Sequence, residues 1–236
     1  MPTLAERAFW KSIQTHSFLG VYYLHGDDEF LKEQAVRQLI AAAVEPATRD
    51  FNLDVRGAAQ LDAQALGTLV HTPPMMAERR AVVVRDVAAL KSDVRAVLDE
   101  HLARESRRAE SADVVLVLVA VGGERAKPDK ALQGLKGAVE FPPLSGDRVP
   151  RWITHHVATE LGASIAPDAA SLLQSAVGTD LPTLAAELDK LASYTAGAEI
   201  DEAAVAAVVG VRRGETLGDF LDRVAVRDAP GALEIL

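Results

Sequence analysis

Two short runs of consecutive apolar residues, 81–84 and 114–119, constrain the fold of this chain more than any other feature. Runs of this length, rich in β-branched residues, are typical of strands that are covered on both faces. Helical spacing of apolar residues before and after each run predicts helices between the strands. Because alternating strands and helices are joined by right-handed crossovers, we expect an α/β fold with a mostly parallel sheet between helices. Three weaker segments complete the predicted sheet: residues 20–25, 51–55 and 138–141.

The chain changes character after the pair Pro142-Pro143. From there on, every periodic segment has helical spacing, including a stripe of Leu and Ala from Leu181 to Leu191. A length of 236 residues corresponds to about one and a half domains of ~150 residues each. We therefore predict an α/β domain over residues 1–143 and a small all-helical bundle over residues 144–226.

The last ten residues, 227–236, have the pattern of a helix that has just begun. Asp228 suits a helix N-cap, and Pro230 fits the first turn, where its missing N–H has no partner to lose. An apolar stretch follows, and the sequence stops within about two helical turns. We expect these residues to start a further domain, which is missing from a C-terminally truncated chain.

The composition excludes several kinds of protein. Cysteine is absent, so disulfides, thiolate nucleophiles and Cys-ligated metals are impossible. With 34 acidic and 25 basic residues the net charge is −9, which argues against a protein whose main role is to coat DNA. The longest apolar run, residues 114–121, is too short to cross a membrane, and Glu6, Arg7 and Lys11 exclude a secretory signal peptide. We expect a cytoplasmic protein without a membrane partner.

An α/β domain followed by a helical bundle is the layout of an AAA+ module, so the turn after the first strand is the place to look for a nucleotide site. A phosphate-binding loop requires a Gly-rich turn followed by Lys and by Ser or Thr. This chain instead has the short acidic sequence Gly26-Asp27-Asp28-Glu29. Its carboxylates suit a helix N-terminus and would repel a triphosphate. We expect no ATP hydrolysis.

Other catalytic patterns are weak. The adjacent His155 and His156 point in different directions on a helix, so they do not match the i, i+4 spacing of a zinc protease. Ser145 has Pro143 where the first glycine of a nucleophile elbow would stand. We expect no intrinsic catalysis, no cofactor and no metal.

Four segments, in order, carry a resemblance to a known family. They are an opening strand with its acidic turn, a Pro-rich segment with two bulky apolar residues and a basic pair, an entry to the helical bundle, and a signature within the bundle. In this sequence they are residues 21–31, 72–84, 140–144 with Trp152-Ile153, and 178–181 with 187–192. The chain thereby resembles, over residues 20–226, the delta subunit of the bacterial clamp loader, a part of the DNA polymerase III holoenzyme.

The resemblance implies a P-loop-less AAA+ fold and a protein that opens the ring-shaped sliding clamp for loading onto primed DNA, without hydrolysing ATP itself. In that family two adjacent apolar residues on a helix fill a hydrophobic pocket of the clamp. The matching positions are Met75 and Met76, flanked by Pro74 and Arg79. The family usually has aromatic or Leu side chains there, and Met is a flexible apolar substitute. From the residues alone, two core methionines ahead of a buried strand are the alternative.

The resemblance also implies partners: the sliding clamp, the ATPase and delta prime subunits of the loader, and DNA through the assembled complex. Four basic residues are candidate contacts to DNA or to another subunit, with ordinary solvated side chains as the alternative. They are Arg80, Arg107, Arg108 and Lys127. Two other functions stay open: a degenerate AAA+ subunit that still binds nucleotide, and an uncharacterised α/β enzyme with a helical cap.

Overall fold

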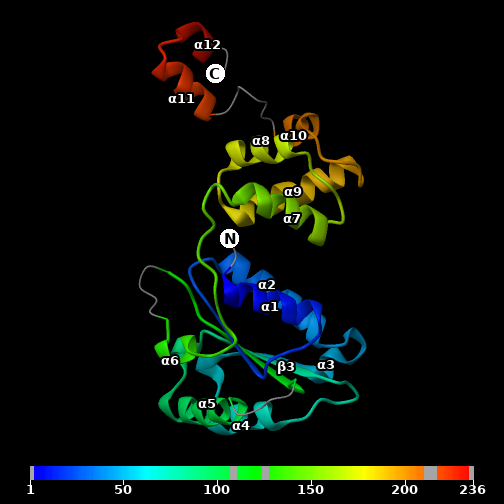
Figure 1. Ribbon diagram of the computed structural model, residues 1–236, viewed down its shortest axis with the longest axis vertical. Coiled ribbons are helices and arrows are strands. Elements are labelled where there is room, and N and C mark those ends of the chain that lie inside the picture. The colour runs from blue at the N-terminus through cyan, green and yellow to red at the C-terminus, as the bar shows by residue number, and fades with distance from the viewer. Residues whose placement is uncertain (1–2, 107–110, 124–127, 210–216, 234–236) are drawn as a thin grey trace. The chain divides into compact units, whose positions relative to one another are not determined.

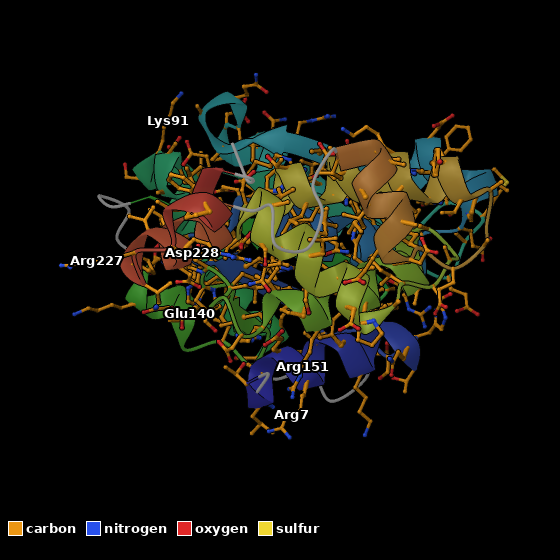
Figure 2. The ribbon with its side chains drawn as sticks, turned by 90° about the horizontal axis from the view of Figure 1, so that it is seen from above. Arg7, Lys91, Glu140, Arg151, Arg227 and Asp228 are labelled. Atoms are coloured by element: carbon orange, nitrogen blue, oxygen red, sulfur yellow. The ribbon has the colours of Figure 1, made fainter. Side chains whose placement is uncertain are left out.

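The computed structural model describes residues 3–106, 111–123, 128–209 and 217–233. The chain divides into two compact units, Met1–Pro143 and Leu144–Leu236. The first unit combines helices with a sheet, and the second is built from helices (Figure 1). Charged side chains such as Arg7 and Lys91 are exposed and extend away from the ribbon (Figure 2).

The first unit contains a five-stranded sheet in the order β2-β3-β4-β1-β5. All neighbouring strands are parallel, which confirms the predicted sheet. The strands are β1 (Val21–His25), β2 (Leu53–Gly57), β3 (Arg80–Arg85), β4 (Val114–Val119) and β5 (Ala138–Glu140). Both faces of β3 and β4 are covered, and this is why residues 81–84 of β3 and all of β4 are apolar at every position and do not alternate.

Helices cover both faces of this sheet (Figure 1). The longer ones are α1 (Leu4–Gln14) and α2 (Glu29–Ala43) on one face, and α4 (Ala63–His71) and α5 (Ser92–Glu105) on the other. Alternate residues of β1 enter the two cores, with Tyr22 and Leu24 on the side of α1 and α2, and Val21 and Tyr23 on the side of α4 and α5. A shorter helix, α6 (Lys130–Gln133), precedes β5.

The second strand begins later than the sequence predicted. Residues 51 and 52 belong to a short helix, α3 (Arg49–Asn52), so β2 begins at Leu53 and not at Phe51. The helical stretch begins earlier, in a 3-10 turn over Pro46–Thr48 with Pro in its first turn. As a result, Phe51 and Asn52 leave the strand and form the bend that leads into it.

The second unit contains α7 (Val149–Glu160), α8 (Pro167–Val177), α9 (Leu181–Thr195) and α10 (Glu202–Val209). These helices bury apolar stripes of the predicted kind; in α9 the buried residues are Leu181, Leu184, Ala185, Leu188 and Leu191. Asp180 caps α9 by accepting a hydrogen bond from Thr183 N (3.1 Å). An isolated parallel bridge between Ile165 and Ile200 interrupts the otherwise helical pattern.

Two short helices, α11 (Leu217–Ala225) and α12 (Ala229–Leu233), follow. Asp228 precedes α12, as the sequence predicted for an N-cap, and it accepts a hydrogen bond from Gly231 N (3.1 Å). The same carboxylate pairs with Arg223 Nη1 of α11 (2.6 Å), which ties the two helices together.

Candidate functional site

The segment between α4 and β3 carries the two methionines that the family resemblance singles out. α4 ends just before Pro73 and Pro74, which have no N–H that could continue a helix. The backbone then bends through residues 75–78 and enters β3. The resemblance implied that Met75 and Met76 stand on a helix. They lie instead on this bend.

Both methionines are exposed. The exposed fraction is 51% for Met75 and 78% for Met76, so the alternative of two core methionines is wrong. Met76 also has a left-handed backbone conformation, with φ +53°. This conformation costs a residue with a Cβ atom roughly 1–2 kcal/mol. Strain of this kind is often found at functional positions.

A buried asparagine of α3 holds the bend in place. Asn52 is fully buried. Its Oδ1 accepts a hydrogen bond from Met75 N (2.7 Å), and its Nδ2 donates to Met75 O (2.8 Å). The same Nδ2 donates to Thr48 O (3.1 Å). One side chain therefore binds both polar groups of the Met75 backbone. The sequence analysis missed Asn52, because no local pattern marks a contact between residues 23 positions apart.

Arg80, a predicted contact to DNA or to another subunit, is turned into the protein. Only 9% of the residue is exposed. Its Nη1 donates a hydrogen bond to Phe51 O (2.7 Å), and its Nη2 pairs with Asp54 of the neighbouring strand β2. Because a buried guanidinium needs such partners, Nη1 and Nη2 bond within this unit, and Arg80 is buried where a contact to DNA or to another subunit was predicted.

The remaining predicted contact residues are not part of the exposed methionine pair. Arg107, Arg108 and Lys127 are outside the described residues. Arg79 is half-buried, with its guanidinium carbon 5.4 Å from the centre of the Phe18 ring and its Nη1 3.1 Å from Glu78 Oε2. Pro74 is also half-buried. Arg79 and Pro74 thus flank the bend without forming part of its exposed apolar tip.

The turn after β1, where an AAA+ protein would hold a nucleotide, is occupied by side chains of the chain itself. Gly26 has φ +112°, and a Cβ atom there would collide with the backbone of Phe141. Asp28 caps α2 by accepting a hydrogen bond from Leu31 N (2.9 Å). Burial raises the pKa of the Asp28 carboxyl, and the backbone hydrogen bonds oppose that rise.

Two further carboxylates of this turn bind the chain that follows β4. Glu29 Oε1 accepts a hydrogen bond from Gly122 N (2.5 Å), and Asp27 Oδ1 accepts one from Gly123 N (3.1 Å). The nearly fully buried Lys32 donates to Glu29 Oε1 (2.8 Å) and to the first carbonyl after β4 (2.6 Å). The two amide groups and the ammonium group therefore bond to partners within the chain, in a region where a phosphate-binding loop would direct such groups at a phosphate.

The histidines are spread over both units. His25 ends β1 and stacks on Tyr23, with ring centres 5.0 Å apart. Burial lowers the pKa of His25, so its ring is neutral near pH 7. In α7, His155 is exposed, whereas His156 is buried and stacks on Trp152 (4.8 Å). The two neighbours therefore point in different directions, as expected.

The described residues offer neither a cluster of metal ligands nor a membrane-spanning helix. In the parts of the chain that the structure describes, no three His, Asp or Glu side chains are grouped so that they could hold a metal ion. Of the helices in those same parts, none has the length and apolar content needed to span a bilayer.

Comparison with known proteins reveals relatives of this chain. A family model described as "DNA polymerase III, delta subunit" matches residues 22–141, just over half of the chain. DNA polymerase III subunit delta of Bacillus subtilis is 28% identical over 191 residues, which cover 78% of this chain and 55% of the relative. The chain thus spans a little over half the length of this curated relative.

Solved structures share the fold. The DNA clamp loader delta protein of Bacillus subtilis matches with a TM-score of 0.66 and 24% identity, over 97% of this chain and 69% of that one. The RuvB Holliday junction branch migration motor of Thermotoga maritima matches with a TM-score of 0.51 and 13% identity, over 93% and 73%. The fold is therefore the predicted AAA+ arrangement of a parallel sheet followed by a helical bundle. Because the family model covers most of the α/β unit, including the methionine bend, the chain belongs to the DNA polymerase III delta subunit family.

Proposed function

We propose that this chain acts in a clamp loader as the subunit that binds the ring-shaped sliding clamp and opens it for loading onto primed DNA. The observation that carries the proposal is the exposed pair Met75 and Met76, which stands on a bend held by the buried Asn52 in a member of the delta family. Apolar side chains exposed to water gain free energy when they enter a pocket of a partner.

The chemistry of the pair suits such a pocket. Methionine is unbranched and polarisable, so it adapts to a shallow apolar cavity. Because Asn52 already holds the Met75 backbone, binding needs to order the two side chains but little of the main chain, and this lowers the entropic cost of association. Opening follows only if the pair binds the open clamp more tightly than the closed one, since a ligand shifts an equilibrium by its differential affinity.

We propose that this subunit does not hydrolyse ATP itself. The carboxylates of Asp27 and Glu29 already hold the amide groups after β4, and the buried Lys32 is paired with Glu29. A triphosphate would have to displace these bonds and approach an acidic turn. The family suggests the remaining partners: the ATPase and delta prime subunits of the loader, with DNA contacted through the assembled complex.

A titration of the purified chain against the sliding clamp of the same organism tests the proposal. Energy transfer between a fluorescent pair across the subunit interface of the clamp reports opening, and the emission anisotropy of the labelled clamp reports binding. We expect saturable binding with a loss of energy transfer, and equal affinity with and without Mg²⁺–ATP.

The outcomes separate the alternatives. No binding overturns the clamp proposal, and binding without loss of energy transfer overturns the opening step. Binding that requires ATP favours a nucleotide-binding subunit, and ATP hydrolysis by the chain alone overturns the statement that it has none.

A further inference from the structure

A third exposed apolar side chain belongs to a residue next to the methionine bend. Phe51 is 54% exposed, although phenylalanine is among the residues most often buried. It directly precedes Asn52, whose side chain binds both polar groups of the Met75 backbone. Since consecutive Cα atoms are 3.8 Å apart, the Phe51 backbone lies within about 10 Å of the Met75 backbone.

The sheet topology gives an independent reason for this proximity. Phe51 precedes β2, and the methionines precede β3. β2 and β3 are neighbouring parallel strands, with Leu53 opposite Ala81. Segments that lead into two such strands lie at the same edge of the sheet. Phe51, Met75 and Met76 therefore share the amino edge, although they come from two separate segments.

Polar contacts hold both segments. Arg80 Nη1 donates to Phe51 O (2.7 Å), and Asn52 makes three hydrogen bonds to backbone groups. The charge of Arg80 is balanced by Asp54, with which it pairs. Phe51, Met75 and Met76 thus present apolar side chains from a backbone that is fixed before a partner arrives, which favours binding, and the exposed charges of Arg49, Asp50 and Glu78 lie beside them in the same segments.

We propose that the clamp-binding surface consists of two segments, with Phe51 as its third apolar contact and Asn52 as the positioning residue that holds Phe51 beside Met75 and Met76. This inference rests on the proposed function, and its partner is the same apolar pocket of the sliding clamp. A rigid aromatic ring adds contact area at a low cost in conformational entropy, which complements the flexible methionines.

Phe51→Ala tests the third contact. Half of the residue's surface is exposed and can be buried by a partner, so we expect clamp binding to weaken roughly 5- to 15-fold with little change in Tm. Val121→Ala is the matched control, because Val121 is 55% exposed but follows β4 at the opposite edge of the sheet. Its clamp affinity should equal that of the unmodified chain. If Phe51→Ala binds equally well while loss of the methionines weakens binding, the inference is overturned and the proposed function stands.

Asn52→Ala tests the positioning role, with hydrogen exchange of the Met75 amide as a direct readout. We expect faster exchange at Met75 and weaker clamp binding by the folded protein. Asn52→Ala should have a much smaller effect on clamp binding when Met75 and Met76 are already alanine, because a positioning residue acts through them. An equal effect in both backgrounds overturns the role.

Asn52→Asp is a second variant for the case in which the alanine variant does not fold. It keeps the acceptor for Met75 N but removes the donor to Met75 O and Thr48 O. We expect a partial loss of clamp affinity from this variant at pH 7. Unchanged clamp affinity together with faster Met75 exchange would show that the bend needs no positioning, and would overturn the role as well.

Discussion

Replacing both exposed methionines by alanine should separate clamp binding from folding. Met75 and Met76 are 51% and 78% exposed, so together they offer about 1.3 times the surface of one fully exposed methionine. Burial of a whole methionine side chain contributes about 1.5–3 kcal/mol, and burial of the exposed part of this pair therefore contributes about 2–4 kcal/mol. We expect Met75→Ala/Met76→Ala to weaken clamp binding roughly 30-fold to several hundred-fold.

The same double variant should fold almost as well as the unmodified chain. Exposed side chains contribute little to the packed core, and most surface substitutions change the free energy of unfolding by less than about 0.5 kcal/mol. For a chain of this size, we expect Tm to move by no more than about 2–3 °C. Core methionines would behave in the opposite way, because truncation of a packed Met to Ala costs about 2–5 kcal/mol per residue.

The measurement is a fluorescence titration of the clamp with each variant, together with a thermal melt of the chain alone. Leu4→Ala/Val121→Ala is a matched control, since these residues are 79% and 55% exposed and lie outside the bend. The control should bind the clamp with unchanged affinity. The reasoning fails if the methionine variant melts many degrees earlier while its folded fraction binds the clamp as tightly as before, or if the control loses as much affinity.

A second experiment tests the backbone conformation of Met76 by comparing glycine and alanine at this position. Glycine adopts the left-handed conformation at φ +53° without a Cβ clash, so Met76→Gly should relieve strain that alanine retains. We expect Met76→Gly to be at least as stable as Met76→Ala but to bind the clamp no better. If Met76→Gly is clearly less stable than Met76→Ala, the left-handed backbone is not strained in the way that this argument requires.

Three further predictions concern stability. Burial lowers the pKa of His25 in the folded chain, so unfolding takes up a proton when the pH falls below the ordinary histidine pKa of about 6.5. The free energy of unfolding should therefore fall as the pH drops from 7.5 to 5.5, and it should fall less in His25→Phe. Equal pH dependence of the two proteins in urea titrations would refute the assignment. Glu29→Gln should lower the free energy of unfolding by about 1–2 kcal/mol because it weakens charged hydrogen bonds. Glu78→Gln, which changes the exposed carboxylate of the pair with Arg79, should leave the free energy of unfolding within about 0.5 kcal/mol. Asp54→Asn leaves Arg80 without its charge partner and should cost about 3–5 kcal/mol, seen as a clear drop in Tm; no drop would show that the pair contributes nothing.

The strands at the centre of the sheet could be predicted because the local sequence alone indicates that they are buried. Residues 81–84 and 114–119 are apolar at every position and rich in valine, which is typical of a strand covered on both faces. The start of β2 could not be predicted in the same way. Phe51 is a residue type that favours strands, but the turn that begins at Pro46 continues as a helix through Phe51 and Asn52.

The candidate site was only partly predictable. Met75 and Met76 could be found by resemblance, and their exposure fits the assignment. Their support could not be found, because Asn52 and Arg80 act through contacts to backbone groups that are distant in the sequence. The sequence alone does not show whether an arginine is buried or exposed. The burial of Arg80 depends on Asp54, which the fold places beside it on the neighbouring strand.

The two edges of the sheet differ in the side chains that they expose. Parallel sheets usually bind their ligands at the carboxyl edge. At that edge, Asp27 and Glu29 accept hydrogen bonds from backbone amides that could otherwise bind a phosphate, and the ammonium group of Lys32 donates to a backbone carbonyl. The exposed apolar residues Met75 and Met76 stand at the opposite edge, ahead of β3. A nucleotide at the carboxyl edge would have no direct contact with them. A ligand at the carboxyl edge and a partner at Met75 and Met76 would therefore not compete for the same side chains.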